Sequence, residues 1–202
     1  MDFTWVWRWL HYVAGVMWIG HLWFFNFVNL NLQGDASYPP EMKKVVNPLL
    51  MTRALFMFRW GAMFTFLTGL VLLGLIHGLD FSKTAGSDRA LFMMMGAAFG
   101  TIMWFNVWFI IWPAQKKIIG AAQGGPAVDP ALPKKAAMAS RINTYLSVPM
   151  LIGMLGGAHG EYQIFGGGVV GLCIAVAVGL ALVKLGYLFA PKVSTKLFTP
   201  QA

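Results

Sequence analysis

The sequence is poor in charge, and this scarcity excludes most classes of soluble protein. Of its 202 residues only 11% are Asp, Glu, Lys or Arg, whereas 58% are hydrophobic. A soluble domain carries about 25% charged residues, so this chain lacks the polar surface that water requires. The composition excludes a soluble globular enzyme, a disordered chain and a nucleic-acid-binding protein. It predicts an all-α integral membrane protein.

Cysteine is nearly absent as well. The single cysteine, Cys173, lies in an apolar run, so neither a disulfide framework nor a cysteine-based metal site is expected. The motif C-x-x-C-H is missing from the sequence. Covalent attachment of a c-type haem is therefore excluded.

Five long apolar runs predict a bundle of about five transmembrane helices in one domain that covers residues 1–202. A helix needs about 20 apolar residues to cross a bilayer. The predicted spans are residues 5–28, 54–77, 90–112, 136–157 and 165–189. Between them, the polar stretches 29–48 and 114–135 are predicted as loops. Pro113 is predicted to end the third run, and Pro149 to kink the fourth.

Basic residues predict the orientation of these spans. If the N-terminus is outside, eleven lysines and arginines fall in inner segments and three in outer segments. Cytoplasmic segments of membrane proteins carry such an excess, so the N-terminus is predicted outside and the C-terminus inside. The inner residues are Lys43, Lys44, Arg53, Lys116, Lys117, Lys134, Lys135, Arg141, Lys184, Lys192 and Lys196, and the outer ones are Arg8, Lys83 and Arg89.

Three histidines, His11, His77 and His159, fall on three different helices in the predicted outer third of the membrane. A neutral imidazole is a good iron ligand, and histidines on facing helices can hold a haem within a bundle. The sequence therefore predicts haem b, with two of these three side chains as axial ligands. Trp18 shares a helix face with His11, and this face could accept a flat macrocycle. Alternatively, His77 and His159 are polar tips at the membrane interface.

A second polar cluster is predicted in the inner half of the membrane. No Asp or Glu lies within a predicted span, so the intramembrane Arg59 needs another partner. Backbone carbonyls, Asn and Tyr oxygens, a haem propionate, a quinone or a substrate anion would each suit its guanidinium. Alternatively, Arg59 extends to the cytoplasmic interface. The predicted substrate- or anion-binding residues are His21, Arg59, Asn106, Arg141, Asn143 and Tyr145, with Asn26, Thr144 and Ser147 at similar depth.

The aromatic residues are interpreted mainly as packing and membrane anchoring. Tryptophans at positions 5, 7, 9, 104, 108 and 112 fall near predicted span ends, where amphipathic rings favour the interface. The glycine-rich fifth span could also serve a homo-oligomeric interface.

Four motifs together resemble the urate oxidase N-terminal domain family, the membrane domain of the membrane-bound urate hydroxylases. They are RWLHYVAGVMWIG at 8–20, FRW at 58–60, GTIM at 100–103 with Asn106 and PAQKK at 113–117, and RINTYLSVP at 141–149 followed by His159. The likeness covers most of the chain from Arg8 to Phe189. The sequence resembles a short form without the cytochrome c domain. It also has Ile142 where histidine is common in the family, and Gly61 where an acidic residue is common.

This resemblance implies a multi-pass protein of the bacterial inner membrane that is tied to electron transfer. We expect a haem-b-binding electron-transfer protein or subunit, which passes electrons to a separate cytochrome c or to a larger membrane redox complex. One alternative is an enzyme that oxidises urate or another purine at an Arg59–Asn106–Asn143–Tyr145 site. Another alternative is a non-catalytic accessory subunit of a respiratory or oxygenase complex. The bilayer itself is an expected partner, and a quinone is a further candidate ligand.

Overall fold

The computed structural model describes residues 3–77 and 86–193, which form five long helical segments and no strand. The first segment comprises α1 (Thr4–Trp23), a π-helical turn η1 (Phe24–Asn29) and α2 (Leu30–Gly34). The second is α3 (Pro40–His77), and the third comprises α4 (Asp88–Phe105), a π-helical turn η3 (Asn106–Ile111) and α5 (Trp112–Ala122). The fourth is α6 (Ala131–His159) and the fifth is α7 (Gly168–Phe189). Short 3-10 turns η4 (Glu161–Phe165) and η5 (Ala190–Lys192) flank α7.

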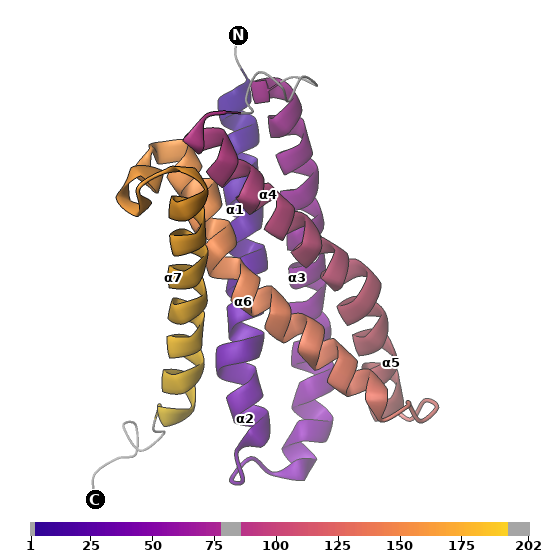
Figure 1. The fold of residues 1–202 in the computed structure, drawn as a ribbon. Coiled ribbons are helices and arrows are strands. Elements are labelled where there is room, and N and C mark those ends of the chain that lie inside the picture. The colour runs from indigo at the N-terminus through magenta and orange to yellow at the C-terminus, as the bar shows by residue number, and fades with distance from the viewer. Residues whose placement is uncertain (1–2, 78–85, 194–202) are drawn as a thin grey trace, which may run out of the picture.

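Successive segments run in opposite directions, as Figure 1 shows. We call the end of the bundle where α1 begins and α3 ends the upper end. The lower end is the one where α7 ends and α6 begins (Figure 1). The two ends of the described chain therefore lie at opposite ends of the bundle, as an odd number of passes requires.

Four of the segments are long and apolar enough to cross a membrane. They span Thr4–Gly34, Pro40–Ile76, Asp88–Ala122 and Gly168–Lys192. The structure confirms the predicted all-helical fold, with four helices of membrane-spanning length and composition. The remaining long helix, α6, is less apolar because polar side chains fill its first half. A fifth crossing and the orientation of the bundle stay predictions.

The helices extend farther than the apolar runs, so the predicted loops at 29–48 and 114–135 are wrong over most of their length. The first segment continues to Gly34 and α3 already begins at Pro40. Likewise α5 continues to Ala122, and α6 begins at Ala131. A polar sequence stays helical where the backbone hydrogen bonds of an adjoining helix continue into it, because elongation of an existing helix is cheap.

Pro113 does not end the third segment as predicted. It lies at the start of α5, directly after the π-helical turn η3. Proline is tolerated in the first turn of a helix, because its missing N–H is not needed there. The π-helical turn thus separates α4 from a second helix that has the proline in its first turn.

Close backbone contacts join the helices into pairs. A Cβ atom added to Gly61 on α3 would lie 3.0 Å from the backbone nitrogen of Trp18 on α1. One added to Gly179 on α7 would lie 2.7 Å from the ring of Pro149 on α6. Small residues at such contacts allow the close approach that drives helix association in lipid. The pairs α1–α3, α4–α6 and α6–α7 make up the bundle.

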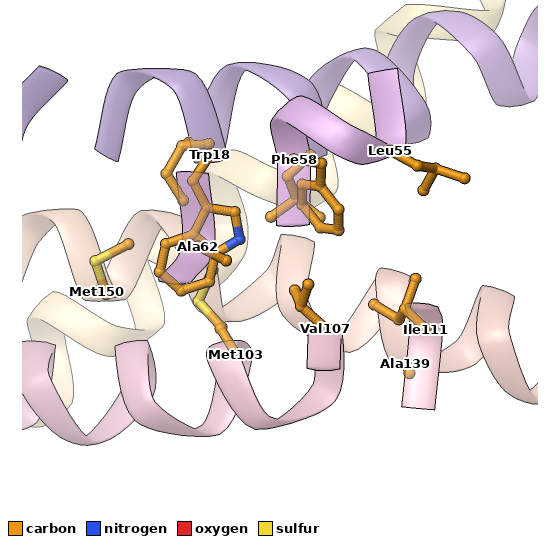
Figure 2. Close-up of a cluster of buried hydrophobic side chains, with 11 residues drawn as sticks. Trp18, Leu55, Phe58, Ala62, Met103, Val107, Ile111, Ala139 and Met150 are labelled. Carbon is orange, nitrogen blue, oxygen red and sulfur yellow. The ribbon is translucent and has the colours of Figure 1, made fainter. Parts of the chain in front are cut away.

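Large apolar side chains fill the space between the paired helices. Trp18 from α1, Phe58 from α3 and Val107 from η3 are each at most 1% exposed and point toward one another (Figure 2). Met103 of α4 and Met150 of α6 close the same cluster. This core lies midway along the bundle, and it holds four of the five segments together.

At the upper end, one carboxylate connects the beginnings of two helices. Asp88 is the first residue of α4, and its Oδ1 accepts a hydrogen bond of 2.8 Å from the backbone nitrogen of Gly168, the first residue of α7. The preceding Gly167 has φ +69°, and a Cβ atom there would collide with the Asp88 carboxylate. A negative charge at a helix N-terminus is favourable, so Asp88 fixes where α7 starts.

Candidate functional site

The His11 side chain is held by α3 in one defined tautomer. Its Nδ1 lies 2.9 Å from the backbone oxygen of Thr65 and 3.1 Å from the hydroxyl of Thr68. A carbonyl oxygen can only accept, so Nδ1 carries the proton and Nε2 keeps its lone pair. Metal-bound histidines are oriented in the same way, by donation from the other ring nitrogen to a carbonyl. The donor chemistry of His11 therefore fits an axial ligand of haem iron.

The other two predicted iron ligands differ from His11. His159 is the last residue of α6, and its side chain is exposed. The side chain of His77 lies outside the part of the chain that the structure describes. Within the described residues, no group of three or more His, Cys, Asp or Glu side chains could hold a metal ion. The site thus rests on His11, with a second axial ligand still to be assigned.

The helix face that joins His11 to Trp18 packs against α3. A Cβ atom on Gly69 would lie 3.2 Å from Cε1 of His11, and one on Gly15 would lie 3.9 Å from the Thr65 side chain. Trp18 itself is 1% exposed, within the apolar core. The residues Gly15 and Trp18 therefore serve the α1–α3 contact.

A stripe of small polar residues runs along α6 and faces the π-helical turns of its neighbours. We call it the α6 polar seam, and its members are Ser140, Asn143, Thr144 and Ser147. Asn143, fully buried, accepts a 2.8 Å hydrogen bond from the Asn106 amide and donates one of 2.9 Å to the backbone oxygen of Met103. The first bond reaches the start of η3, and the second reaches the last turn of α4. The predicted neighbours Asn106 and Asn143 thus do meet, as partners of each other.

The other side of the seam holds η1 in a similar way. The Asn26 amide donates to Ser140 over 2.9 Å and to the backbone oxygen of Leu22 over 2.9 Å, while Tyr187 of α7 donates to the Asn26 carbonyl over 3.0 Å. Trp23 Nε1 donates to the Ser147 hydroxyl over 3.0 Å. Buried polar groups that are fully paired in this way specify one packing arrangement. The seam therefore connects α1, α6 and α7 through hydrogen bonds.

Arg59 lies among tryptophans and away from the seam. Its guanidinium carbon is 4.0 Å from the centroid of the Trp112 ring, 5.3 Å from that of Trp108 and 5.5 Å from that of Trp60. A cation over the face of an indole is stabilised by about 2 kcal/mol when it is shielded from water. We call Arg59 with these three rings the tryptophan cage. The rings of the cage stabilise the Arg59 cation, for which no predicted span supplies a carboxylate partner.

The tryptophan cage contains hydrogen-bond donors that lack acceptors. The Nε of Arg59 and the Nε1 of Trp108 are both buried, and neither has a partner among the described residues. The indole nitrogens of Trp18 and Trp104, outside the cage, are also buried and have no acceptor among the described residues. A buried donor without an acceptor costs about 1–3 kcal/mol. An excess of donors beside a guanidinium is the arrangement that suits an anion or a carbonyl oxygen.

The remaining residues of the predicted inner cluster are divided between other contacts. His21 donates from Nδ1 to the backbone oxygen of Met17 on its own helix, over 2.6 Å. The Arg141 guanidinium lies 5.0 Å from the centroid of the Tyr187 ring, and Tyr145 stacks on the same ring at 5.5 Å. The structure therefore does not bring the predicted cluster together at one site. Asn106 and Asn143 meet at the α6 polar seam, and Arg59 lies in the tryptophan cage. His21, Arg141 and Tyr145 lie in neither group.

Sequence reasoning missed the tryptophan cage because it assigned Trp108 and Trp112 to membrane anchoring. The two residues are four apart, and an intramembrane arginine lies at similar depth. This combination of spacing and depth was the available signal. It also missed the acceptors of His11, since Thr65 and Thr68 resemble ordinary helix-interior threonines.

Comparison with known proteins decides the family. The family model described as urate oxidase N-terminal matches residues 80–196, which is more than half of the chain. The chain belongs to the urate oxidase N-terminal family. Searches of the curated proteins and of the solved structures gave no match.

The matched range of the urate oxidase N-terminal family contains two of the four motifs seen in the sequence. The segments around Asn106 and Asn143 lie within it, together with the whole α4–α6 pair. His11 and Arg59 lie before it. Family membership therefore rests on the half of the chain that contains the α6 polar seam, η3 and two rings of the tryptophan cage.

Proposed function

We propose that this member of the urate oxidase N-terminal family is an integral membrane protein that binds haem b and serves electron transfer. The observation that carries the proposal is the His11 imidazole, whose Nδ1 is held by Thr65 and whose Nε2 keeps its lone pair. A histidine inside a membrane span is costly, which makes it a candidate functional residue. A bound haem b supplies reversible one-electron chemistry at its iron.

The protein's own residues have defined parts in this proposal. The Thr65 carbonyl and the Thr68 hydroxyl fix the plane of the His11 ring, so that Nε2 is presented in one direction. His77 or His159, which end α3 and α6 at the upper end, would provide the second ligand. A separate cytochrome c or a larger membrane redox complex would accept the electrons at that end.

The charge distribution supports a location in the bacterial inner membrane with the upper end outside. Ten described lysines and arginines lie on the lower halves of the helices, whereas Arg8 and Arg89 lie at the upper end. Cytoplasmic ends of membrane proteins show this excess of cations. The ten are Lys43, Lys44, Arg53, Lys116, Lys117, Lys134, Lys135, Arg141, Lys184 and Lys192.

The optical spectrum of the purified full-length protein, oxidised and reduced, tests the haem proposal. We expect a Soret band and, by pyridine extraction, haem b. His11→Gln should abolish haem binding, because glutamine is a poor iron ligand. His21→Gln is the matched control, since His21 lies on the same helix but bonds to its own backbone. Absence of a Soret band from the wild type, or equal haem content in the two variants, would overturn the proposal.

The tryptophan cage favours a second candidate function, the oxidation of urate or a similar purine anion. Arg59 Nε and Trp108 Nε1 are buried donors that have no acceptor among the described residues. Urate is an anion with several carbonyl oxygens, which could accept hydrogen bonds from them. Urate consumption by membranes that contain the protein should then fall for Arg59→Gln. It should not change for Arg53→Gln, whose guanidinium donates to the backbone oxygen of Leu49 on its own helix. No urate consumption by wild-type membranes supplied with cytochrome c would exclude this candidate.

A further inference from the structure

A groove opens between the first segment, α6 and α7, on the side away from the tryptophan cage. Its volume is about 350 Å³, and its lining is apolar: Trp23, Phe27, Val148, Leu182, Val183 and Gly186. Its size falls within the range of small-molecule sites, on the order of 300–1,000 Å³. Leu182 is 51% exposed at its edge, so the groove is open to the surroundings of the bundle. In a membrane those surroundings are lipid acyl chains.

The end of the groove nearer the lower end of the bundle is polar and cationic. Tyr187 directly follows Gly186 on α7. The guanidinium carbon of Arg141 lies 5.0 Å from the centroid of the Tyr187 ring. Arg141 precedes Val148 by seven residues on α6, which places the two on one helix face about 10 Å apart. Tyr145 stacks on Tyr187 between them, at 5.5 Å. The apolar groove therefore has an exposed arginine near its lower end.

Further charges at this end are also positive. Lys192 lies in η5, which packs against η1 beside the groove. Among the described residues, neither α6 nor α7 contains an Asp or Glu. Arg141 has no carboxylate partner on these two helices, and its side chain is exposed beside the Tyr187 ring. The rim thus complements a phosphate and repels a cationic headgroup.

From these features we infer a binding site for one anionic phospholipid. An acyl chain occupies the groove, and the headgroup phosphate is bound by Arg141 with help from Lys192. Basic pockets between membrane helices on the cytoplasmic side bind anionic headgroups by the same chemistry. The inference requires only that the apolar helices lie in a membrane, and it is independent of haem binding.

Native mass spectrometry of the full chain in mild detergent tests the site, with phosphatidylglycerol and phosphatidylcholine of identical acyl chains as probes. We expect wild-type protein to retain phosphatidylglycerol preferentially. Arg141→Gln should weaken the binding of phosphatidylglycerol about fivefold, which is the effect of one surface cation on an anionic headgroup. Arg53→Gln removes another exposed arginine, away from the groove, and should leave the binding unchanged.

A second variant tests the groove separately from the charge. Val148→Phe fills the apolar lining, so it should reduce the binding of both lipids, while Arg141→Gln reduces only the preference for the anionic one. Helix content by circular dichroism establishes that each variant is folded. Equal binding of the two lipids by the wild type would overturn the inference. So would an unchanged preference in Arg141→Gln, or a quinone found in the groove in place of the phospholipid.

Discussion

Gly153 of α6 lies directly against Gly96 of α4. A Cβ atom added to Gly153 would come within 2.8 Å of the Gly96 backbone nitrogen and within 2.6 Å of the Phe92 backbone oxygen. The atoms on both sides are backbone, which cannot move aside as a flexible side chain would. The α4–α6 pair, which lies within the family-matched range, therefore requires glycine at both positions.

Gly153→Ala should destabilise the protein by about 1–3 kcal/mol, because an overpacked contact forces the backbones apart. The matched control is Gly74→Ala on α3, where nothing lies within 4 Å of the added methyl group. There alanine should stabilise the helix by about 0.5–1 kcal/mol. Thermal unfolding in detergent, followed by circular dichroism, measures both. Equal effects of the two substitutions would contradict the packing described.

Asn143→Ala should cost about 1–3 kcal/mol, because the buried Asn106 amide loses its acceptor and the Met103 carbonyl loses its side-chain donor. Asn31→Ala is a fair comparison, since Asn31 donates only to the Phe27 carbonyl of its own helix. It should cost less than 1 kcal/mol. The midpoint of denaturant unfolding reports the difference. If the Asn31 variant proved the less stable of the two, the α6 polar seam would not hold α6 to η3.

Trp112→Leu should destabilise the protein by about 2 kcal/mol, because the Arg59 cation loses the indole ring that lies 4.0 Å away. Trp5→Leu, at a position that is 69% exposed, should have little effect. A double-mutant cycle with Arg59→Met isolates the interaction, since the cost of Trp112→Leu should largely disappear once the cation is gone. Additive effects of the two substitutions would mean that the ring and the cation do not interact.

The orientation can be measured with two exposed glutamines at opposite ends of the bundle. Gln123 follows α5 at the lower end, and Gln163 lies in η4 at the upper end. In a Cys173→Ser background, a membrane-impermeant maleimide added to intact cells should label Gln163→Cys only. Broken cells should show labelling of both. The reverse pattern would place the lower end outside.

Composition and apolar run length were sufficient to predict the fold class, because a helix that crosses a bilayer needs a continuous run of apolar residues. The same signal could not predict the helix ends. Residues 29–34 and 114–122 contain polar residues that interrupt the apolar runs, yet they continue helices that begin in those runs. Nor did it find η1 and η3, since a π-helical turn reflects tertiary contacts that periodicity does not encode.

The sequence identified most of the candidate-site residues, but it did not predict which of them contact one another. Asn106 and Asn143 were placed together by depth alone, and they are partners. Arg59 was placed with them because depth along a span says nothing about direction around the helix axis. Its neighbours are instead Trp108 and Trp112.

The π-helical turn η3 determines the register of everything that follows it in the third segment. Such a turn accommodates one residue more than an α-helical turn, and each residue rotates a helix by about 100°. Trp112 faces Arg59 only because that extra residue precedes it. Removal of one residue between Asn106 and Ile111 would carry the indole around the axis, away from the cation, while leaving every residue type of the tryptophan cage in the sequence. The cage is thus specified by a spacing as much as by its side chains.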